Sequence, residues 1–413
     1  MSNREGGFAW RALTVSAAFV VLAATAAVAA GGAQDHGAVK LRTIGSDTAR
    51  GVSDAVVVDD GALVHTALLF PDTATGEQAP SADAGAQVAS VLRTLERVLA
   101  AAGADARGLV RLHVYVADAS VTTAVDGELA RRFAGGHAPA VTLVESRMPR
   151  AGALVAMDAI AATSRRPPSG TPLRLVVDGV PPTTAGGAHL AVQPDGPFVV
   201  VSGRAAPGAF EAAVTGTMEQ LRGDLAGVGL DFSHVLQVKT FLGDMTKAAD
   251  AQRLVAAVFD GTPPPQVVTE WRDAGQPVEI ELLAAMPSSP SGTPALTYVE
   301  PIASRFSRLA RVAGGRPVFV SGLTGADADP VAQVREIYEH LARVLAEAGS
   351  DMRHLVKATY YVSDAGADRE INEIRPTVYD EARPPAASKI SVTGVGRQGR
   401  GVTIDMLAVT RER

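Results

Sequence analysis

In two distant stretches of the chain, hydrophobic residues recur every three or four positions. This spacing places them on one side of an α-helix, so both stretches predict an amphipathic helix that packs on a sheet. The apolar positions are Val88, Leu92, Leu95 and Leu99 in the first stretch and Val334, Ile337, Leu341 and Leu345 in the second.

A glycine and then a strand-like pattern follow each helix, and the same pattern occurs three times. Residues 103–118, 229–244 and 349–364 align without gaps and begin 126 and 120 residues apart. Each segment opens on a glycine, which suits the left-handed turn that ends a helix. The Val, Leu, Tyr and Phe residues that follow alternate with the period of a strand. The chain therefore contains three copies of one unit.

Each copy continues with another helix and two more strands. The predicted second helices cover residues 121–133, 247–259 and 366–380. The strands predicted after them cover residues 141–146 and 153–162, 266–271 and 278–285, and 388–393 and 401–409. Before the first helix of a copy, residues 199–203 and 318–322 indicate a strand pair of the hairpin type. This order of strands and helices predicts an α/β unit.

The N-terminal segment differs from the rest of the chain. Arg4 and Arg11 precede an uncharged run rich in Ala and Val over residues 12–30, which contains the small-x-small sequence Ala27-Val28-Ala29. These features are typical of a secretory signal peptide, so we expect a secreted or periplasmic protein. The alternatives are an uncleaved membrane anchor over residues 12–30 and the disordered leader of a cytoplasmic protein.

Proline, serine and glycine concentrate in two further segments, residues 165–170 and 287–292, which predict linkers. The predicted organisation is a signal peptide or anchor over residues 1–30, followed by units over residues 40–164, 171–287 and 295–413.

Composition limits the chemistry of the three units. Of the 413 residues 47% are hydrophobic, enough for packed cores, and the absence of cysteine excludes disulfides, thiolate nucleophiles and zinc–sulfur sites. The formal net charge of −6 argues against nucleic-acid binding. The eight histidines form no metal-ligating pair, and no nucleotide-binding or nucleophile-elbow motif occurs. We therefore expect no metal, no cofactor and no nucleic-acid partner.

The repeated unit resembles the small proteins of the RidA (YjgF) family. The likeness is carried by VFVSG at residues 318–322, by the segment 349–364, and by residues 147–150 and 153–161 of the first copy. It extends over nearly everything after the leader, three times over.

The resemblance implies an α+β fold in which each unit has a mixed sheet with two helices on one face. Family members form homotrimers whose sheets make a central barrel, with ligand clefts at the subunit interfaces. A sheet covered on one side must still bury its other apolar face, so three copies in one chain can build that trimer internally. We expect an intramolecular pseudo-trimer that is a monomer in solution and binds a small molecule at the clefts between its units.

The active-site positions that the resemblance implies differ between the copies. Family deaminases hydrolyse imines or enamines derived from amino acids, and an Arg in a Pro-Ala-Arg-Ser/Thr stretch grips the substrate carboxylate with two hydrogen bonds. A Glu in the last strand positions the attacking water. The Arg position holds Val141, Gln266 and Ala387, and the Glu position holds Ala156, Glu279 and Thr403. The carboxylate-binding arginine is thus absent from every copy, and the acid remains in the second copy alone.

Six residues are candidates for a diverged site. Glu279 and Lys389 are the catalytic candidates, because Lys389 follows Ala387 by two residues and a strand points both side chains the same way. The candidates for substrate binding are Ser202, Arg204, Gln266 and Ser321. Structural alternatives stay open: solvated surface cations for the lysine and the arginine, an interface ion pair for the glutamate, and bonds to strand-end backbone groups for the serines.

Two functions follow from these residues. The first is an exported imine or enamine hydrolase that acts on a small reactive metabolite through a diverged site with Glu279 and Lys389. The second is a non-catalytic small-molecule-binding or scaffold protein, which the loss of the arginine in every copy favours. A ribonuclease ranks third, because the chain is acidic and has no cationic stripe.

Overall fold

One order of strands and helices occurs three times in a computed structural model of the chain. The structure describes residues 39–72, 83–167, 171–287, 292–303 and 305–411. Repeat 1 contains β1 (Lys40–Asp47), β2 (Val52–Asp60), β3 (Ala62–Thr66), α1 (Ala84–Ala101), β4 (Leu109–Val116), α2 (Thr122–Phe133), β5 (Ala140–Glu145) and β6 (Val155–Thr163). Repeat 2 contains β7 (Leu173–Leu175), β8 (Leu190–Val192), β9 (Phe198–Arg204), α3 (Phe210–Ala226), β10 (Val235–Leu242), α4 (Ala248–Ala256), β11 (Gln266–Glu270) and β12 (Val278–Ala285). Repeat 3 contains β13 (Leu296–Ile302), β14 (Phe306–Val312), β15 (Pro317–Leu323), α5 (Pro330–Glu347), β16 (Leu355–Val362), α6 (Ala365–Val378), β17 (Ala386–Ser391) and β18 (Val402–Val409).

The long helices form where the hydrophobic spacing predicts them. The four apolar positions identified in each stretch are buried in α1 and α5. The side chains of Asp83 and Asp329 cap the two helices by accepting a hydrogen bond from a backbone N–H of the first turn. Gly103, Gly229 and Gly349 follow α1, α3 and α5 with φ values of 72°, 76° and 80°. This left-handed conformation is the one predicted for a glycine that ends a helix.

Within each repeat, four strands form a mixed sheet. In repeat 1, β4 pairs parallel with β5 and antiparallel with β6, and β6 pairs antiparallel with β3. The equivalent strands of repeat 2 (β10, β11, β12 and β9) and of repeat 3 (β16, β17, β18 and β15) pair in the same way. The mixed α+β fold expected for the unit is therefore confirmed.

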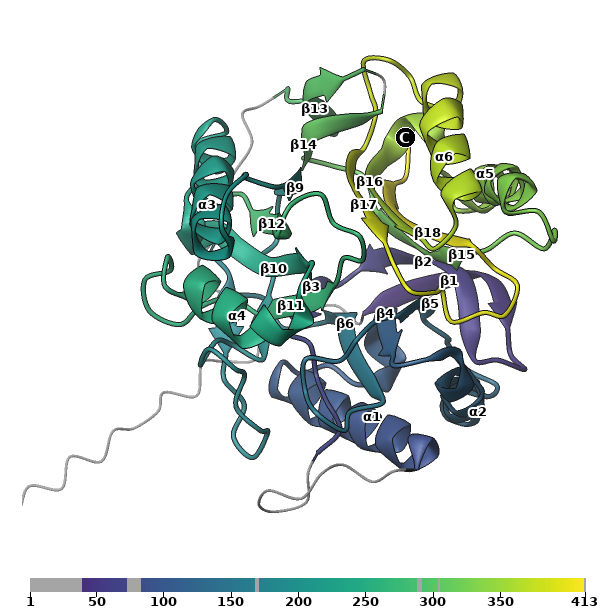
Figure 1. The fold of residues 1–413 in the computed structure, drawn as a ribbon, viewed down its shortest axis with the longest axis horizontal. Coiled ribbons are helices and arrows are strands. Elements are labelled where there is room, and N and C mark those ends of the chain that lie inside the picture. Colours follow the sequence, from purple (N-terminus) through teal and green to yellow (C-terminus); the bar gives the residue numbers. More distant parts are fainter. Residues whose placement is uncertain (1–38, 73–82, 168–170, 288–291, 304, 412–413) are drawn as a thin grey trace, which may run out of the picture. The chain divides into compact units, whose positions relative to one another are not determined.

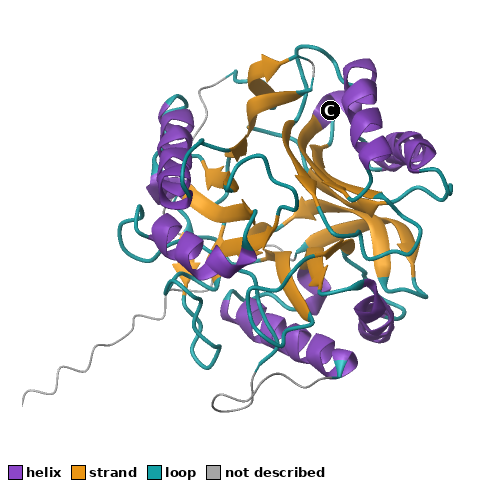
Figure 2. Ribbon diagram, viewed as in Figure 1, coloured by secondary structure: helices purple, strands orange, loops and turns teal. Residues whose placement is uncertain are grey.

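Strand pairing between repeats closes the three sheets into a ring. β2 of repeat 1 pairs antiparallel with β15 of repeat 3, β14 of repeat 3 with β9 of repeat 2, and β8 of repeat 2 with β3 of repeat 1. Each repeat thus lends a strand to one neighbour and receives a strand from the other, which makes an intramolecular pseudo-trimer. Figure 1 shows the helix pairs α1–α2, α3–α4 and α5–α6 outside the strands, and Figure 2 shows the strands gathered between them.

Two kinds of hydrophobic core result from this closure. Each repeat has its own core between its helices and its sheet. Two further clusters combine side chains of all three repeats where the inner faces of the sheets meet. One of them contains Tyr115, Phe241 and Tyr361, which occupy equivalent positions on β4, β10 and β16. The ring therefore buries the sheet faces that the helices leave uncovered.

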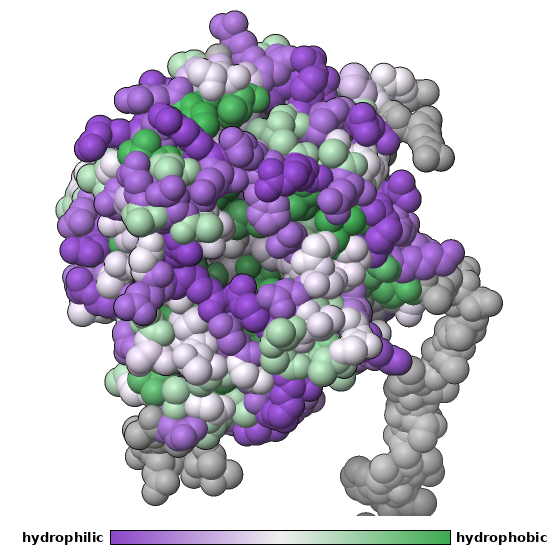
Figure 3. All heavy atoms as spheres, turned by 90° about the vertical axis from the view of Figure 1, so that its right-hand side faces the viewer, coloured by the Kyte–Doolittle hydropathy of each residue, from purple (hydrophilic) through white to green (hydrophobic). Residues whose placement is uncertain are grey.

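All of the described residues belong to one compact unit, His36–Arg413. No helix in the described part of the chain is long and apolar enough to cross a membrane. The predicted leader over residues 1–30 lies outside the described residues, as do residues 168–170 and 288–291 of the predicted linkers. Figure 3 shows one face of the molecule, on which polar residues predominate and apolar residues form separate small patches.

Candidate functional site

The interfaces between repeats 1 and 3 and between repeats 2 and 3 share one arrangement of hydrogen bonds. At the 1–3 interface, the hydroxyl of Ser321 donates to the carbonyl of Ser53 (2.6 Å) and accepts from the N–H of Val141 (2.7 Å). At the 2–3 interface, the hydroxyl of Ser202 donates to a carbonyl of β14 (2.6 Å) and accepts from the N–H of Ala387 (2.8 Å). Both serines, which the sequence offered as substrate-binding candidates, bond to the backbone of the neighbouring repeat.

The interface between repeats 1 and 2 departs from this arrangement. Thr66 replaces the serine and donates to the carbonyl of Ala67 (3.0 Å). Besides the pairing of β3 with β8, a bond from the N–H of Leu68 to the carbonyl of Gln266 (3.0 Å) joins the two repeats here. The buried side chain of Gln266 donates to the carbonyl of Gln252 (3.2 Å) and borders a cavity of about 40 Å³. A cavity of this size is too small for a metabolite.

The glycine that follows each interface serine faces the residue at the family's Glu position. A Cβ on Gly203 would overlap the carboxylate of Glu279, and a Cβ on Gly322 would lie 2.7 Å from Oγ1 of Thr403. The close approach of a side chain from the last strand therefore requires glycine at both positions. An acid faces the 2–3 interface, a hydroxyl faces the 1–3 interface, and the equivalent residue of repeat 1 is Ala156.

The 1–3 interface opens into a cavity of about 500 Å³, which we call the 1–3 cleft. Repeat 1 contributes residues of β2 and β5 to its walls, and repeat 3 contributes residues of β15, β18 and the loop before β18. Val141 and Thr403, at the family's Arg and Glu positions, both line it. A cavity of this volume accommodates a small metabolite.

A glycine-rich loop of repeat 3, residues 394–401 (GVGRQGRG), forms part of the cleft wall. The N–H of Glu145 on β5 donates to the carbonyl of Gly394 (2.9 Å), and the hydroxyl of Thr122 donates to the carbonyl of Gly396 (2.8 Å). Gly396 has a φ of 65°, and a Cβ there would collide with a side chain of β5. The glycines thus let the loop lie directly against repeat 1.

This loop brings two arginines to the 1–3 cleft. Arg397 makes two hydrogen bonds to the carboxylate of Asp126 on α2, with nitrogen–oxygen distances of 2.5 and 2.8 Å. Arg50 lies 3.8 Å from the same carboxylate, so one acid serves two guanidinium groups. Arg400 donates to two backbone carbonyls before α5 (2.6 and 3.0 Å) and forms no ion pair with any carboxylate that the structure describes.

The cleft therefore has an excess of positive charge. Its remaining acid, Asp54, lies 2.9 Å from Nε2 of His340. Three guanidinium groups accompany two carboxylates, and guanidinium groups are well suited to bind a carboxylate or a phosphate. The loop thus supplies anion-binding groups to an interface that has Val141 in place of the family's carboxylate-binding arginine.

Arg397 and Arg400 are not among the six candidates that the sequence offered. The signal that was available is the composition of residues 394–401, which are four glycines, two arginines, a valine and a glutamine. Such a segment predicts a basic loop between two strands. The loop reaches the 1–3 interface because it pairs with β5 of another repeat. This contact joins distant parts of the chain, so the local sequence pattern does not predict it.

The 2–3 interface holds the retained acid in a closed environment. Although part of the Glu279 side chain is exposed, its Oε1 is buried and accepts no hydrogen bond from the described residues. Burial raises the pKa of Glu279 from 4.5 to about 7, Ser388 and Lys357 oppose the shift, and Glu281 adds to it. Lys357 forms an ion pair with Glu281, to which Ser388 also donates (2.5 Å). A carboxyl group with a pKa near neutrality can act as a general acid or base.

The two cationic candidates are engaged in ion pairs. Nζ of Lys389 lies 2.6 Å from a carboxylate oxygen of Asp368, and Nε of Arg204 lies 2.6 Å from Asp224. Among the interactions of the described residues, none joins Lys389 to Glu279. The six candidates are distributed as follows: Ser321 at the 1–3 interface, Gln266 at the 1–2 interface, Glu279, Ser202 and Arg204 on the repeat-2 strands of the 2–3 interface, and Lys389 on β17 beside it.

The fold and its interfaces define a class of protein, a single chain that closes three α/β units into a ring with ligand-sized cavities where the units meet. In the described ranges, no group of three or more His, Asp or Glu side chains has the arrangement of a metal site. A model of the family described as Endoribonuclease L-PSP matches residues 48–163 and 293–410, which are more than half of the chain. The chain belongs to this family, and the predicted RidA (YjgF) membership is confirmed.

Individual relatives match a length of about one repeat. Protein DfrA of Myxococcus xanthus is 33% identical over 113 residues, which are 25% of this chain and 85% of DfrA. YyfB of Yersinia pestis, described as a protein of unknown function of the conserved Rid family, is 27% identical and covers 30% of this chain and 98% of its own, with a TM-score of 0.27. NMB1025 of Neisseria meningitidis, a member of the YjgF family, is 28% identical and covers 29% of this chain and 97% of its own, with a TM-score of 0.23.

Proposed function

We propose that the chain binds a small molecule with a carboxylate in the 1–3 cleft and does not hydrolyse it there. The observation that supports this function best is the pairing of two loop arginines, Arg397 and Arg400, with Thr403 in one open cavity. The arginines supply charge for the carboxylate, and the threonine stands where family deaminases have the acid that positions water.

The cationic groups fit this role in different ways. Arg397 is oriented by Asp126, so a ligand carboxylate shares its guanidinium with that acid. Arg400 is held through Nη1 alone, which leaves its other N–H groups for a ligand. At the family's Glu position, Thr403 stays protonated and uncharged and does not act as the base that activates water. Asp54 and His340 also line the cleft, and they are bonded to each other. Binding without turnover is the chemistry that these residues support.

A second candidate function rests on Glu279. Its pKa of about 7 suits a residue that gives and takes a proton during hydrolysis of an imine. The two cationic candidates of the 2–3 interface, Lys389 and Arg204, are paired with acids. Substrate orientation is therefore poorer there, and we place hydrolysis second.

We also propose that the protein is exported and that the ring closes within one chain. The charge and hydropathy of residues 1–30 support export, and the cyclic pairing of the repeats supports a monomer. Fractionation with N-terminal sequencing should find a mature chain that starts just after residues 27–30, outside the cytoplasm. An intact Met1 on cytoplasmic protein contradicts export, and a solution mass of three chains contradicts the monomer.

The binding proposal is tested by calorimetric titration of pyruvate and 2-oxobutanoate, which are small, stable carboxylates. The wild-type chain should bind with saturation, and R397Q/R400Q should bind about 10–100-fold more weakly, because two charge-assisted contacts are lost. Arg107→Gln is the matched control, since Arg107 is exposed and pairs with its neighbour Asp105. No binding, or equal binding by R397Q/R400Q, overturns the proposal.

Ammonia release from enzymatically generated imino acids separates the two candidate functions. We expect the wild-type chain to release ammonia no faster than the uncatalysed reaction. Faster release that Glu279→Gln abolishes and R397Q/R400Q preserves would place the activity at the 2–3 interface and support the second function instead.

A further inference from the structure

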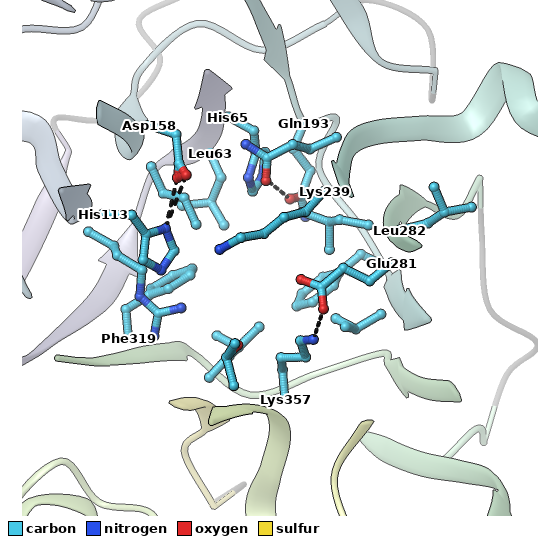
Figure 4. A pocket seen from close by; sticks show the side chains of 18 residues that line it. Leu63, His65, His113, Asp158, Gln193, Lys239, Glu281, Leu282, Phe319 and Lys357 are labelled. Carbon is cyan, nitrogen blue, oxygen red and sulfur yellow. Dashed lines mark hydrogen bonds and ion pairs between the residues drawn. The ribbon is translucent and has the colours of Figure 1, made fainter. Parts of the chain in front are cut away.

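A further cavity, of about 80 Å³, lies among the inner faces of the three sheets, and we call it the axial cavity (Figure 4). The central strands β4, β10 and β16 bring equivalent positions of the three repeats to its walls. The side chains at equivalent positions differ between the repeats, all three in two of the sets and one of three in the last, which a single chain permits and a homotrimer does not. These sets are Arg111, Gln237 and Lys357; His113, Lys239 and Thr359; and, on the paired last strands, Asp158, Glu281 and Asp405.

Two of the three carboxylates are matched by a cation of the first set. Lys357 of repeat 3 forms an ion pair with Glu281 of repeat 2. Nη1 of Arg111 in repeat 1 lies 3.5 Å from Oδ1 of Asp405 in repeat 3. Both pairs are at least four-fifths buried and join different repeats. Each neutralises one carboxylate with one cation.

His113 lies between the remaining carboxylate and Asp405. Its Nδ1 is 2.8 Å from Oδ2 of Asp158, and its Nε2 is 3.2 Å from Oδ2 of Asp405. A neutral imidazole has a single N–H and would point a lone pair at one of these oxygens. Only the imidazolium donates to both, so the geometry favours a charged His113.

Lys239 then remains without a carboxylate at ion-pair distance among the residues that the structure describes. Its Nζ donates to the hydroxyl of Tyr361 (2.7 Å) and lies 5.7, 5.6 and 5.5 Å from the ring centres of Tyr115, Phe241 and Tyr361. The side chain is 7% exposed and extends into the axial cavity in Figure 4. Aromatic faces attract an ammonium group, but they carry no net charge that neutralises it.

The charges around the axial cavity therefore do not cancel. His65 also lines it and adds no charge, because burial lowers the pKa of His65 to about 4. Four cations face three carboxylates, and an unmatched charge in a buried site is costly. The cations are Arg111, His113, Lys239 and Lys357, and the carboxylates are Asp158 and Glu281, which line the cavity, and Asp405, which contacts Arg111 and His113.

We propose that the axial cavity binds one small monovalent inorganic anion, of the size of chloride, against Lys239. The volume of about 80 Å³ holds such an ion together with a few waters and is too small for the ligand of the 1–3 cleft. Nε of Arg111 is buried and has no acceptor among the described residues, so it offers the anion or a neighbouring water one more N–H. The anion links the three repeats by completing the charge balance at their common contact.

Thermal unfolding tests the proposal when chloride is compared with gluconate, which is too large to enter, at equal ionic strength. Chloride should raise the Tm of the wild-type chain by about 1–3 °C with saturation, because an ion that binds the folded state stabilises it. Lys239→Met should lose this rise in Tm, because it removes the ammonium group that contacts the ion. His113→Asn should lose it as well, because it removes the excess positive charge. Lys247→Met, at an exposed lysine, should keep it.

Crystals grown in bromide decide the matter without a variant. An anomalous peak in the axial cavity within hydrogen-bond distance of Nζ of Lys239 is expected. Water alone in the cavity, together with equal Tm values in chloride and gluconate, overturns the proposal. R397Q/R400Q should keep the chloride response, so failure of this site and failure of the 1–3 cleft are separate results.

Discussion

The 1–3 and 2–3 interfaces are built on the same serine-centred hydrogen bonds, yet beside the serine one opens into a cationic cleft and the other holds a largely buried carboxyl group. Ser321 and Ser202 hold the two pairs of repeats together in the same way. In a homotrimer every interface must combine the binding cations with the acid. The fused chain separates them, with Arg397 at one interface and Glu279 at the other.

Two differences in sequence account for this separation. The loop before β18 contains arginines and glycines and lies against β5 of repeat 1, where it contributes to the cleft wall. At the 2–3 interface, Lys357 and Glu281 form a buried ion pair whose charges act on Glu279. The two interfaces thus keep the same backbone arrangement. The side chains of a loop and of the strands determine whether an interface forms a cleft for a ligand or buries a carboxyl group.

The largest expected effect comes from breaking the buried ion pair beside Glu279 at the 2–3 interface. Lys357→Met leaves the Glu281 carboxylate buried without its cation, which should lower the free energy of unfolding by about 3–5 kcal/mol. Urea unfolding measures the loss. Arg397→Gln at the open interface should cost less than about 1 kcal/mol, because its pair with Asp126 is partly exposed. Equal losses in the two variants would contradict the distinction between a closed and an open interface.

The next effect concerns the pH dependence of stability at the 2–3 interface. The pKa of Glu279 is raised from 4.5 to about 7 in the folded chain, so the unfolded chain releases this proton first as the pH rises. The contribution of Glu279 to stability is therefore present below pH 4.5 and is lost as the pH rises to about 7, by a total on the order of 1–3 kcal/mol. Glu279→Gln should remove this loss, so the variant gains stability over wild type with rising pH.

Urea unfolding from pH 4 to pH 8 provides the measurement for Glu279. Glu381→Gln, at an exposed glutamate, is the control and should follow the wild-type curve. If wild type and Glu279→Gln change in parallel, the carboxyl group is hydrated in solution, and the 2–3 interface is as open as the 1–3 cleft.

Local sequence patterns predicted the elements and the retained acid, but they did not predict this contrast. The helical stripes, the strands and the left-handed glycines depend on neighbours within a few residues, and they lie where the sequence places them. The contact of Gly394 with Glu145, by contrast, joins residues far apart in the chain and exists only because the ring closes. The buried state of Glu279 also depends on packing against Gly203 and on charges of another repeat.

A smaller loss of stability is expected when a methyl group is added at Gly322, which forms the floor of the 1–3 cleft. A Cβ on Gly322 would lie 2.7 Å from Oγ1 of Thr403 and 3.1 Å from Cα of Thr142, so Gly322→Ala forces the two strands apart. We expect a loss of about 1–3 kcal/mol in the free energy of unfolding and weaker pyruvate binding. Gly127→Ala is the control, because a Cβ there meets no atom within 4 Å and lies in helix α2. A stable Gly322→Ala variant with unchanged binding would mean that the ligand does not use this floor.

The smallest effect tests how the cleft cations are balanced. The Asp126 carboxylate contacts the guanidinium groups of both Arg397 and Arg50, where it competes with the carboxylate of a ligand. Asp126→Asn should therefore tighten pyruvate binding about 2–5-fold. The free energy of unfolding should change by less than about 1 kcal/mol, because the ion pairs are partly exposed. Added salt should reduce the gain in affinity, since screening weakens interactions between hydrated charges.

Calorimetry at low and high salt distinguishes two roles for Asp126. Asp250→Asn is the matched control, because Asp250 pairs with exposed Arg253 on α4, an element that contributes nothing to the walls of the 1–3 cleft. Tighter binding by Asp126→Asn shows that the acid competes with the ligand for the guanidinium groups. Weaker binding shows that Asp126 orients Arg397 for the ligand, so that the open interface depends on a fixed ion pair as much as the closed one does.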